Sequence, residues 1–180
     1  MIFLDKGMFK EAEIEFARAI SLDSEDPFTL NNMGKLLMLQ GRIDEALKYL
    51  EKALSVKPDY AFAHYNMGKV YRERKEYASA IWHFFFSLKY EPDDVYAMNS
   101  LGRTFLLAGL PEQARDTFEK VLREKDAADP YAIFGLGETY EALEELEKAL
   151  ASYRKLKALP GVAKSLLEKA DARIRTLQGR

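Results

Sequence analysis

Alanine and glycine recur along this chain at a nearly constant interval. Successive members of both series are separated by 34 or 35 residues: Ala12, Ala46, Ala80, Ala114 and Ala149, and Gly34, Gly68, Gly102 and Gly137. A sequence period of this length predicts stacked copies of one small structural repeat. Because stacked repeats present long continuous surfaces, the spacing favours a binding protein over one with a catalytic pocket.

Alignment on the glycines predicts four full repeats, with a partial repeat before them and a single helix after them. The partial repeat covers residues 1–26, the full repeats cover 27–60, 61–94, 95–129 and 130–163, and the last helix covers 164–180, all within one continuous domain. In each full repeat, apolar residues fall at helical spacing in two stretches. The pattern predicts an all-α solenoid of stacked antiparallel helix pairs, closed by a C-terminal capping helix.

The expected helix boundaries agree with this division. An aspartate followed by a proline combines an N-cap carboxylate with a favourable first-turn residue, and it occurs at Asp26-Pro27 and Asp129-Pro130. We expect left-handed backbone in the turn inside each repeat, where glycine is favoured, at Gly7, Gly41 and Gly109. Lys75 and Glu144 hold the same place in two repeats, at a cost of about 1 kcal/mol each.

The first repeat is incomplete in this sequence. Only Met1 to Lys6 precede the turn glycine, which is too short for a full first helix. Two explanations stay open: the chain is a fragment of a longer protein, or another subunit covers the unfinished edge. An open stack requires a solvated terminal repeat, which favours the first explanation.

Composition excludes several classes of function. The formal net charge is −2, so no basic excess favours binding to nucleic acid. No apolar run approaches the roughly 18 residues that a membrane span needs. The chain contains no cysteine, which excludes disulfides and thiolate metal sites. We expect a cytoplasmic location, although a leader that has been removed would change this.

The repeated positions resemble those of the tetratricopeptide repeat, a helix–turn–helix unit of 34 residues. In repeat 61–94 the family-like residues are Met67, Gly68, Tyr71, Ala80, Phe84, Ser87 and Pro92, and in repeat 27–60 they are Met33, Gly34, Leu37, Ala46, Leu50, Ala53 and Pro58. The chain departs from the family where an early tryptophan is replaced by Leu30, His64, Met98 and Ile133. The resemblance implies that the first helix of each repeat lines an inner, concave groove.

Three kinds of side chain recur in register along these first helices. Aromatic residues are Phe28, Phe62, Tyr96 and the adjacent Tyr65; amides are Asn31, Asn32, Asn66 and Asn99; cations are Lys35, Lys69 and Arg103. Amides pair with the main chain of a peptide, cations favour acidic segments, and aromatic rings anchor apolar side chains. We therefore predict a scaffold that binds an extended or short helical, acidic peptide. The alternative is that these columns are inherited framework of the repeat.

One repeat carries an unusual outer face. Positions that are charged in other repeats are Trp82, Phe85 and Phe86 in repeat 61–94, and they share one side of a helix. Exposed aromatic clusters of this kind mark interaction surfaces. The alternative function is thus a structural assembly module that self-associates through this patch or through the N-terminal edge.

The sequence offers no enzymatic site. The two histidines, His64 and His83, are expected to be packed residues, and no zinc-protease or nucleotide-loop motif occurs. Without a positioned base or nucleophile, we expect no enzyme activity, no cofactor and no metal.

Overall fold

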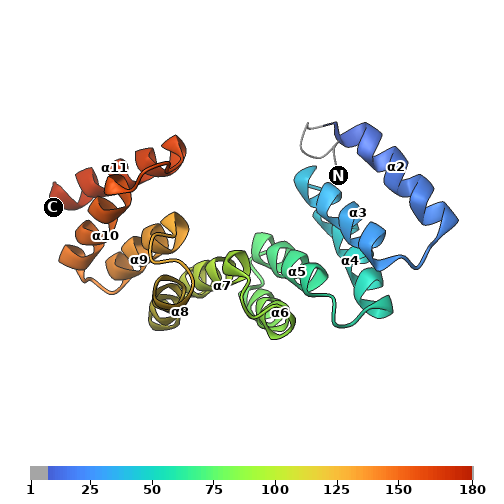
Figure 1. The fold of residues 1–180 in the computed structure, drawn as a ribbon, viewed down its shortest axis with the longest axis horizontal. Helices are drawn as coiled ribbons and strands as arrows, with labels where there is room; N and C mark the ends of the chain where they lie inside the picture. Colours follow the sequence, from blue (N-terminus) through green and yellow to red (C-terminus); the bar gives the residue numbers. More distant parts are fainter. Residues whose placement is uncertain (1–7, 180) are drawn as a thin grey trace. The chain divides into compact units, whose positions relative to one another are not determined.

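A computed structural model describes residues 8–179 of the chain, and every regular element in that range is an α-helix (Figure 1). The helices are α2 (Phe9–Leu22), α3 (Pro27–Leu39), α4 (Ile43–Val56), α5 (Ala61–Glu73), α6 (Tyr77–Tyr90), α7 (Val95–Leu107), α8 (Pro111–Glu124), α9 (Pro130–Ala142), α10 (Leu146–Ala158) and α11 (Lys164–Gln178). The predicted all-α fold of antiparallel helix pairs is confirmed. The start of the partial repeat, including the left-handed turn predicted at Gly7, lies outside the described residues.

The chain divides into two compact units, which we name unit 1 (Met1–Pro92) and unit 2 (Asp93–Arg180). In unit 1, α3 pairs with α4 and α5 pairs with α6, and the two first helices, α3 and α5, also contact each other. In unit 2, α7 pairs with α8 and α9 pairs with α10, and α7 contacts α9. Within each unit, the first helices of consecutive repeats therefore lie side by side.

The periodic glycines and alanines sit where the two helices of a repeat cross. A Cβ atom on Gly68 would lie 2.8 Å from the ring of Phe84, and one on Gly137 would lie 2.4 Å from the ring of Tyr153. Both rings are fully buried, as are the alanines Ala80 and Ala149. The period in the sequence is thus a period of close backbone approach, each glycine making room for one large side chain.

Caps and turns also follow the sequence. Asp26 accepts hydrogen bonds from the backbone N–H groups of Phe28 and Thr29, and Asp129 accepts one from Ala132. The helix-turn residues have positive φ whether or not they are glycine: Gly41, Lys75, Gly109 and Glu144. The structure adds one cap, at Asp94, which stands in register with the other two aspartates but is not followed by proline.

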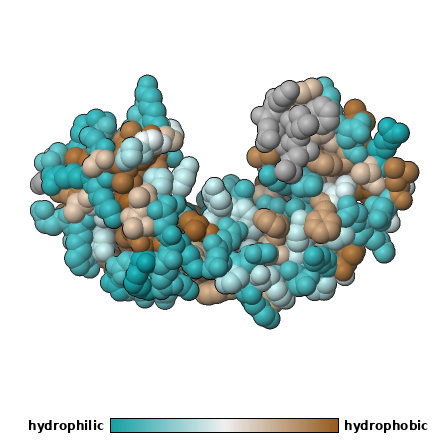
Figure 2. All heavy atoms as spheres, viewed as in Figure 1, coloured by the Kyte–Doolittle hydropathy of each residue, from teal (hydrophilic) through white to brown (hydrophobic). Residues whose placement is uncertain are grey.

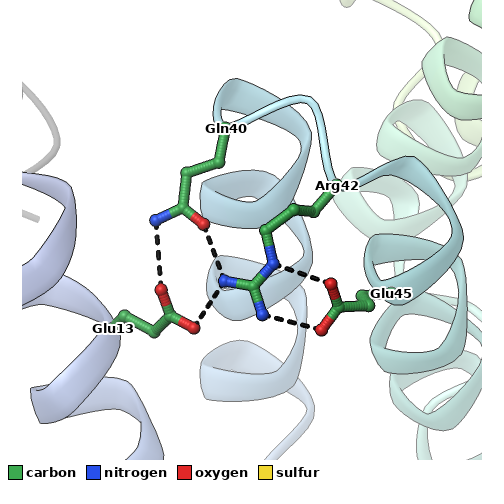
Figure 3. A network of polar contacts seen from close by, with 4 residues as sticks. All are labelled: Glu13, Gln40, Arg42 and Glu45. Carbon is green, nitrogen blue, oxygen red and sulfur yellow. Dashed lines mark hydrogen bonds and ion pairs between the residues drawn. The ribbon is translucent and has the colours of Figure 1, made fainter.

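A polar network fastens α2 to the turn between α3 and α4 (Figure 3). The guanidinium of Arg42 donates from Nε and Nη2 to the carboxylate of Glu45, and from Nη1 to Glu13 on α2 at 2.6 Å. Gln40 accepts from Arg42 and donates to the second oxygen of Glu13. These bonds lower the pKa of Glu13, with the hydrogen bond from Arg42 as the largest cause. One planar cation therefore joins three elements of unit 1.

We expect Arg42→Ala to loosen α2 without unfolding the rest of unit 1. The substitution removes every bond that Arg42 makes in the network, while the apolar contacts of α2 around the buried Ala12 remain. Amide hydrogen exchange should rise in α2 and stay unchanged in α5 and α6. Arg123→Ala, at an exposed ion pair of α8, is the matched control. Unchanged exchange in α2 would contradict this role of the network.

The last helix closes unit 2. Leu166, Ala170 and Leu177 of α11 are buried against α10. The carboxylate of Glu141 on α9 accepts hydrogen bonds from the Tyr153 hydroxyl at 2.6 Å and from Arg173 Nε on α11 at 2.8 Å. The predicted capping helix is confirmed, and it is held by both apolar and charged contacts.

The surface is mostly hydrophilic on the face shown in Figure 2, with apolar side chains scattered over it. None of the helices between residues 8 and 179 combines the length and the apolar character needed to cross a membrane.

Candidate functional site

The first helices of unit 1 bring exposed aromatic rings together. Phe28 on α3 and Phe62 on α5 are 52% and 56% exposed. The ring of Tyr60, which precedes α5, lies between them, edge-on to Phe28 at 5.1 Å and to Phe62 at 5.9 Å. Lys57 lies 5.3 Å from the centre of the Phe28 ring. The two predicted aromatic positions therefore belong to one aromatic surface, in which Tyr60 contacts both rings.

The predicted amides are partly engaged inside the chain. Asn31 and Asn66 are both buried, and the Asn66 side chain donates a hydrogen bond of 2.8 Å to Asn31 Oδ1. This bond joins α3 to α5 and supplies a structural reason for two of the asparagines. Asn32 remains half-buried beside them.

Unit 1 also carries two cations without a carboxylate partner. Lys35 is exposed, Lys69 is half-buried, and neither forms an ion pair within the described residues. Burial lowers the pKa of Lys69, and the positive charges of Arg72 and Lys35 lower it further, against the opposing charge of Glu73. The Lys69 Nζ lies 5.5 Å from the centre of the Tyr65 ring. Three cations therefore act on one another on this face of unit 1, with one carboxylate, Glu73, beside them.

In unit 2 the same positions are arranged differently. Arg103 on α7 forms an ion pair with Glu138 on α9. Burial raises the pKa of the Glu138 carboxyl, and Arg103 opposes that shift. Asn99 donates a hydrogen bond of 2.9 Å to Asp129, the N-cap of α9. Only Tyr96, which is 74% exposed, stays fully open among the predicted positions of this unit.

The outer face of α6 is aromatic, as the sequence indicates. Trp82 and Phe85 are about half-exposed, at 51% and 52%, and Phe86 is partly buried. Trp82 stacks on Phe86 with ring centres 4.1 Å apart, and Lys89 lies 5.4 Å from the centre of the Phe86 ring. The structure brings these three residues together on one helix, while their role as an interaction patch stays a prediction.

A histidine pair lies beneath this patch. His64 and His83 are both buried, and their Nδ1 atoms are 3.1 Å apart. His64 Nε2 lies 3.0 Å from the carbonyl oxygen of Pro58. Burial lowers both pKa values, that of His83 to about 4, and the His64 ring adds to the shift. The pair is therefore neutral at pH 7. Nowhere in residues 8–179 do three histidine or acidic side chains gather as metal ligands.

The sequence pattern misses these pairings for two different reasons. Asn66 with Asn31 and Arg103 with Glu138 are each separated by 35 residues, so the period does bring them near each other. Which positions meet depends on how far one repeat is rotated relative to the next, and this angle is absent from the sequence. His64 and His83 come from the two helices of one repeat, and no spacing rule marks them.

Known structures with the same fold support this architecture. A tetratricopeptide repeat protein from Parabacteroides merdae is 21% identical with a TM-score of 0.82, over 98% of this chain and 70% of that one. MamA from Desulfovibrio magneticus is 21% identical with a TM-score of 0.79, over 93% and 90%. YrrB, described as a TPR protein with an unusual peptide-binding site, is 22% identical with a TM-score of 0.69, over 92% and 84%. At these identities the likeness establishes the fold alone.

Sequence comparison identifies the family. Among curated proteins, no sequence matches the chain. A family model described as TPR repeat matches residues 34–75. A second model, described as tetratricopeptide repeat, matches residues 86–132 and 111–163. These ranges cover most of the helix pairs in both units, and they contain the periodic glycines that pack against the large side chains. The chain therefore belongs to the tetratricopeptide repeat family.

Proposed function

We propose that this protein is a non-enzymatic interaction scaffold, and that the first-helix face of unit 1 binds an acidic, extended peptide segment. We define this face by Phe28, Asn32, Lys35, Phe62, Tyr65 and Lys69. One observation carries the proposal: neither Lys35 nor Lys69 forms an ion pair with a residue between 8 and 179, whereas Arg103, at the corresponding place in unit 2, is paired with Glu138. Among the three cations of this column, those left for a ligand are thus the two lysines of unit 1.

The surroundings of the two lysines suit a peptide with both acidic and apolar residues. Phe28 and Phe62 are half-exposed, and rigid rings bind with little loss of side-chain freedom. Lys69 is already partly desolvated, so a carboxylate that pairs with it gains more than it does with a fully solvated lysine. A bound carboxylate also relieves the repulsion between Lys69, Lys35 and Arg72. YrrB, whose description includes a peptide-binding site, supports peptide binding on this fold.

Binding of a labelled acidic peptide tests the proposal. The probe is a fluorescein-labelled synthetic peptide in which aspartate or glutamate alternates with leucine, followed by anisotropy. We expect Lys35→Glu with Lys69→Glu to weaken binding about tenfold or more, because two attractive charges become repulsive. The control is Lys48→Glu with Lys52→Glu, which makes the same change of charge on the exposed face of α4. Equal losses in both variants, or no binding by the wild type, would contradict the proposal.

The alternative is self-assembly through the outer aromatic patch of Trp82, Phe85 and Phe86. The half-exposed rings of Trp82 and Phe85 favour it. The two functions make opposite predictions for the charge-reversed variant. Peptide binding predicts a loss of affinity with an unchanged oligomeric state, whereas assembly through the patch predicts a concentration-dependent mass that the lysines do not affect. Light scattering of the same samples distinguishes them.

A further inference from the structure

A recess opens on the outer side of unit 1, away from the lysines of the first-helix face. It is lined by Tyr71, Ala78, Ser79, Trp82 and His83, and its volume is about 300 Å³. Small-molecule sites in proteins span about 300–1,000 Å³, so this recess has the size for a single side chain or a small ligand. Its aromatic walls, the hydrogen-bond acceptor on His83 and the charges that act on Tyr71 determine which ligand fits it.

The walls of the recess are aromatic. Tyr71 stacks on His83 with ring centres 5.3 Å apart and an angle of 15° between the planes. Trp82 meets His83 edge-on at 4.8 Å, and its stacking on Phe86 fixes the position of the indole. Electron-rich ring faces attract a cation that has lost part of its water.

The histidine pair fixes a hydrogen-bond acceptor in this recess. The Pro58 carbonyl only accepts, so the proton of neutral His64 lies on Nε2. His64 Nδ1 is then an acceptor, and His83 Nδ1 must donate to it. His83 Nε2, on the opposite side of the ring, is left unprotonated, and no group in the described part of the chain donates to it. His83, which lines the recess, can therefore accept a hydrogen bond from a ligand.

Two carboxylates and one cation act on Tyr71 in the wall of the recess. Burial raises the pKa of Tyr71, and the carboxylates of Glu51 and Glu76 raise it further, against the opposing charge of Arg74. Arg74 is already paired with Glu76 at 2.7 Å. Glu51 forms no ion pair with any described residue, so its charge is available to a ligand. A cation with N–H donors satisfies all three features.

We propose that this recess binds an arginine side chain presented by a partner protein. A guanidinium is flat and weakly hydrated, so it stacks on Tyr71 and Trp82. Its planar N–H groups donate to His83 Nε2 while its charge is compensated by Glu51. A lysine ammonium is more strongly hydrated and lacks the flat face, so arginine is preferred. The site is independent of the acidic-peptide proposal, because it lies on other residues and takes a ligand of opposite charge.

Trp82 reports on the site directly, because it is the only tryptophan in the chain. The experiment titrates wild-type protein with the capped tripeptide glycine-arginine-glycine and follows tryptophan fluorescence. We expect a saturable change with a dissociation constant in the millimolar range, as befits a single side chain. The lysine tripeptide should bind more weakly, and the tripeptide with citrulline, a neutral shape analogue of arginine, should produce no saturable change. An equal response to citrulline or lysine, or none to arginine, would overturn the proposal.

Variants locate the binding and separate it from folding. His83→Phe keeps an aromatic wall but removes the acceptor, and we expect arginine binding to weaken about tenfold or more. Glu51→Gln removes the exposed carboxylate that acts on Tyr71, which is a milder change, and it should weaken binding about threefold. Glu15→Gln, an exposed carboxylate on α2, is the matched control. If Glu51→Gln and Glu15→Gln have the same affinity and His83→Phe binds like the wild type, the assignment is wrong.

Discussion

Replacing Phe84 by alanine is expected to destabilise the chain by about 3–5 kcal/mol, the range for deleting a fully buried aromatic ring. Phe84 has no exposed surface, and it fills the space that Gly68 leaves between the two helices of its repeat. Tyr65 packs against the ring at 5.8 Å. The measurement is the free energy of unfolding from urea titration of wild type and variant. Phe84→Leu is the control, because Leu50 occupies the same place in the preceding repeat, and its loss should be clearly smaller.

Gly68→Ala gives this prediction a sharper form. In the wild type, the new Cβ would lie 2.8 Å from the Phe84 ring, and overpacking of this kind costs about 1–3 kcal/mol. In the Phe84→Ala background the ring is absent, so the same substitution fills space and gains helix propensity of about 1 kcal/mol. We therefore expect Gly68→Ala to change sign between the two backgrounds. Additive effects would show that the glycine is not needed for close approach.

Acid is expected to remove about 3 kcal/mol of stability through His83, as estimated from its pKa shift. Its pKa is lowered from 6.5 to about 4 in the folded chain, mainly by burial. As the pH falls from about 6.5 to about 4, His83 binds a proton in the unfolded chain but not in the folded chain, so unfolding becomes more favourable. The contribution is fully present above pH 6.5 and is lost as the pH falls through this window.

Unfolding free energies at a series of pH values, compared with a matched variant, isolate this effect. His64→Leu with His83→Tyr places in this repeat the residues that the preceding repeat has at Leu30 and Tyr49. Carboxylates such as Asp26 and Glu13 also lose stabilising bonds in acid, and they do so in both proteins. The wild type should therefore lose more stability than the variant between about pH 6.5 and pH 4. Parallel curves would contradict a neutral buried histidine pair.

The fold was predictable because the same contact, between a glycine on the first helix and a large side chain on the second, recurs in each repeat. Gly68 and Phe84 have the same separation in sequence as Gly137 and Tyr153, and the two pairs meet in the same way. The positive φ at Lys75 and Glu144 was also predictable, since glycine holds that place elsewhere. Asp94, an N-cap without a following proline, also stands in register with the other N-cap aspartates.

The candidate site was less predictable, because register shows where a residue lies and not which partner it finds. Lys35, Lys69 and Arg103 are equivalent in the period, yet only Arg103 faces a carboxylate in the next repeat. Asn31 and Asn66 bond to each other because one repeat is rotated relative to the next. The aromatic recess beside His83 depends on a contact between two helices that no periodic position marks.

A charge-swap experiment tests the proposed function most directly. Wild-type protein and the Lys35→Glu, Lys69→Glu variant are each titrated with two labelled peptides, one in which leucine alternates with acidic residues and one in which it alternates with lysine. If unit 1 binds acidic segments through these lysines, the wild type binds only the acidic peptide, and the variant loses that peptide and gains the basic one. If both proteins bind the acidic peptide with the same affinity, the first-helix face of unit 1 is not the binding surface.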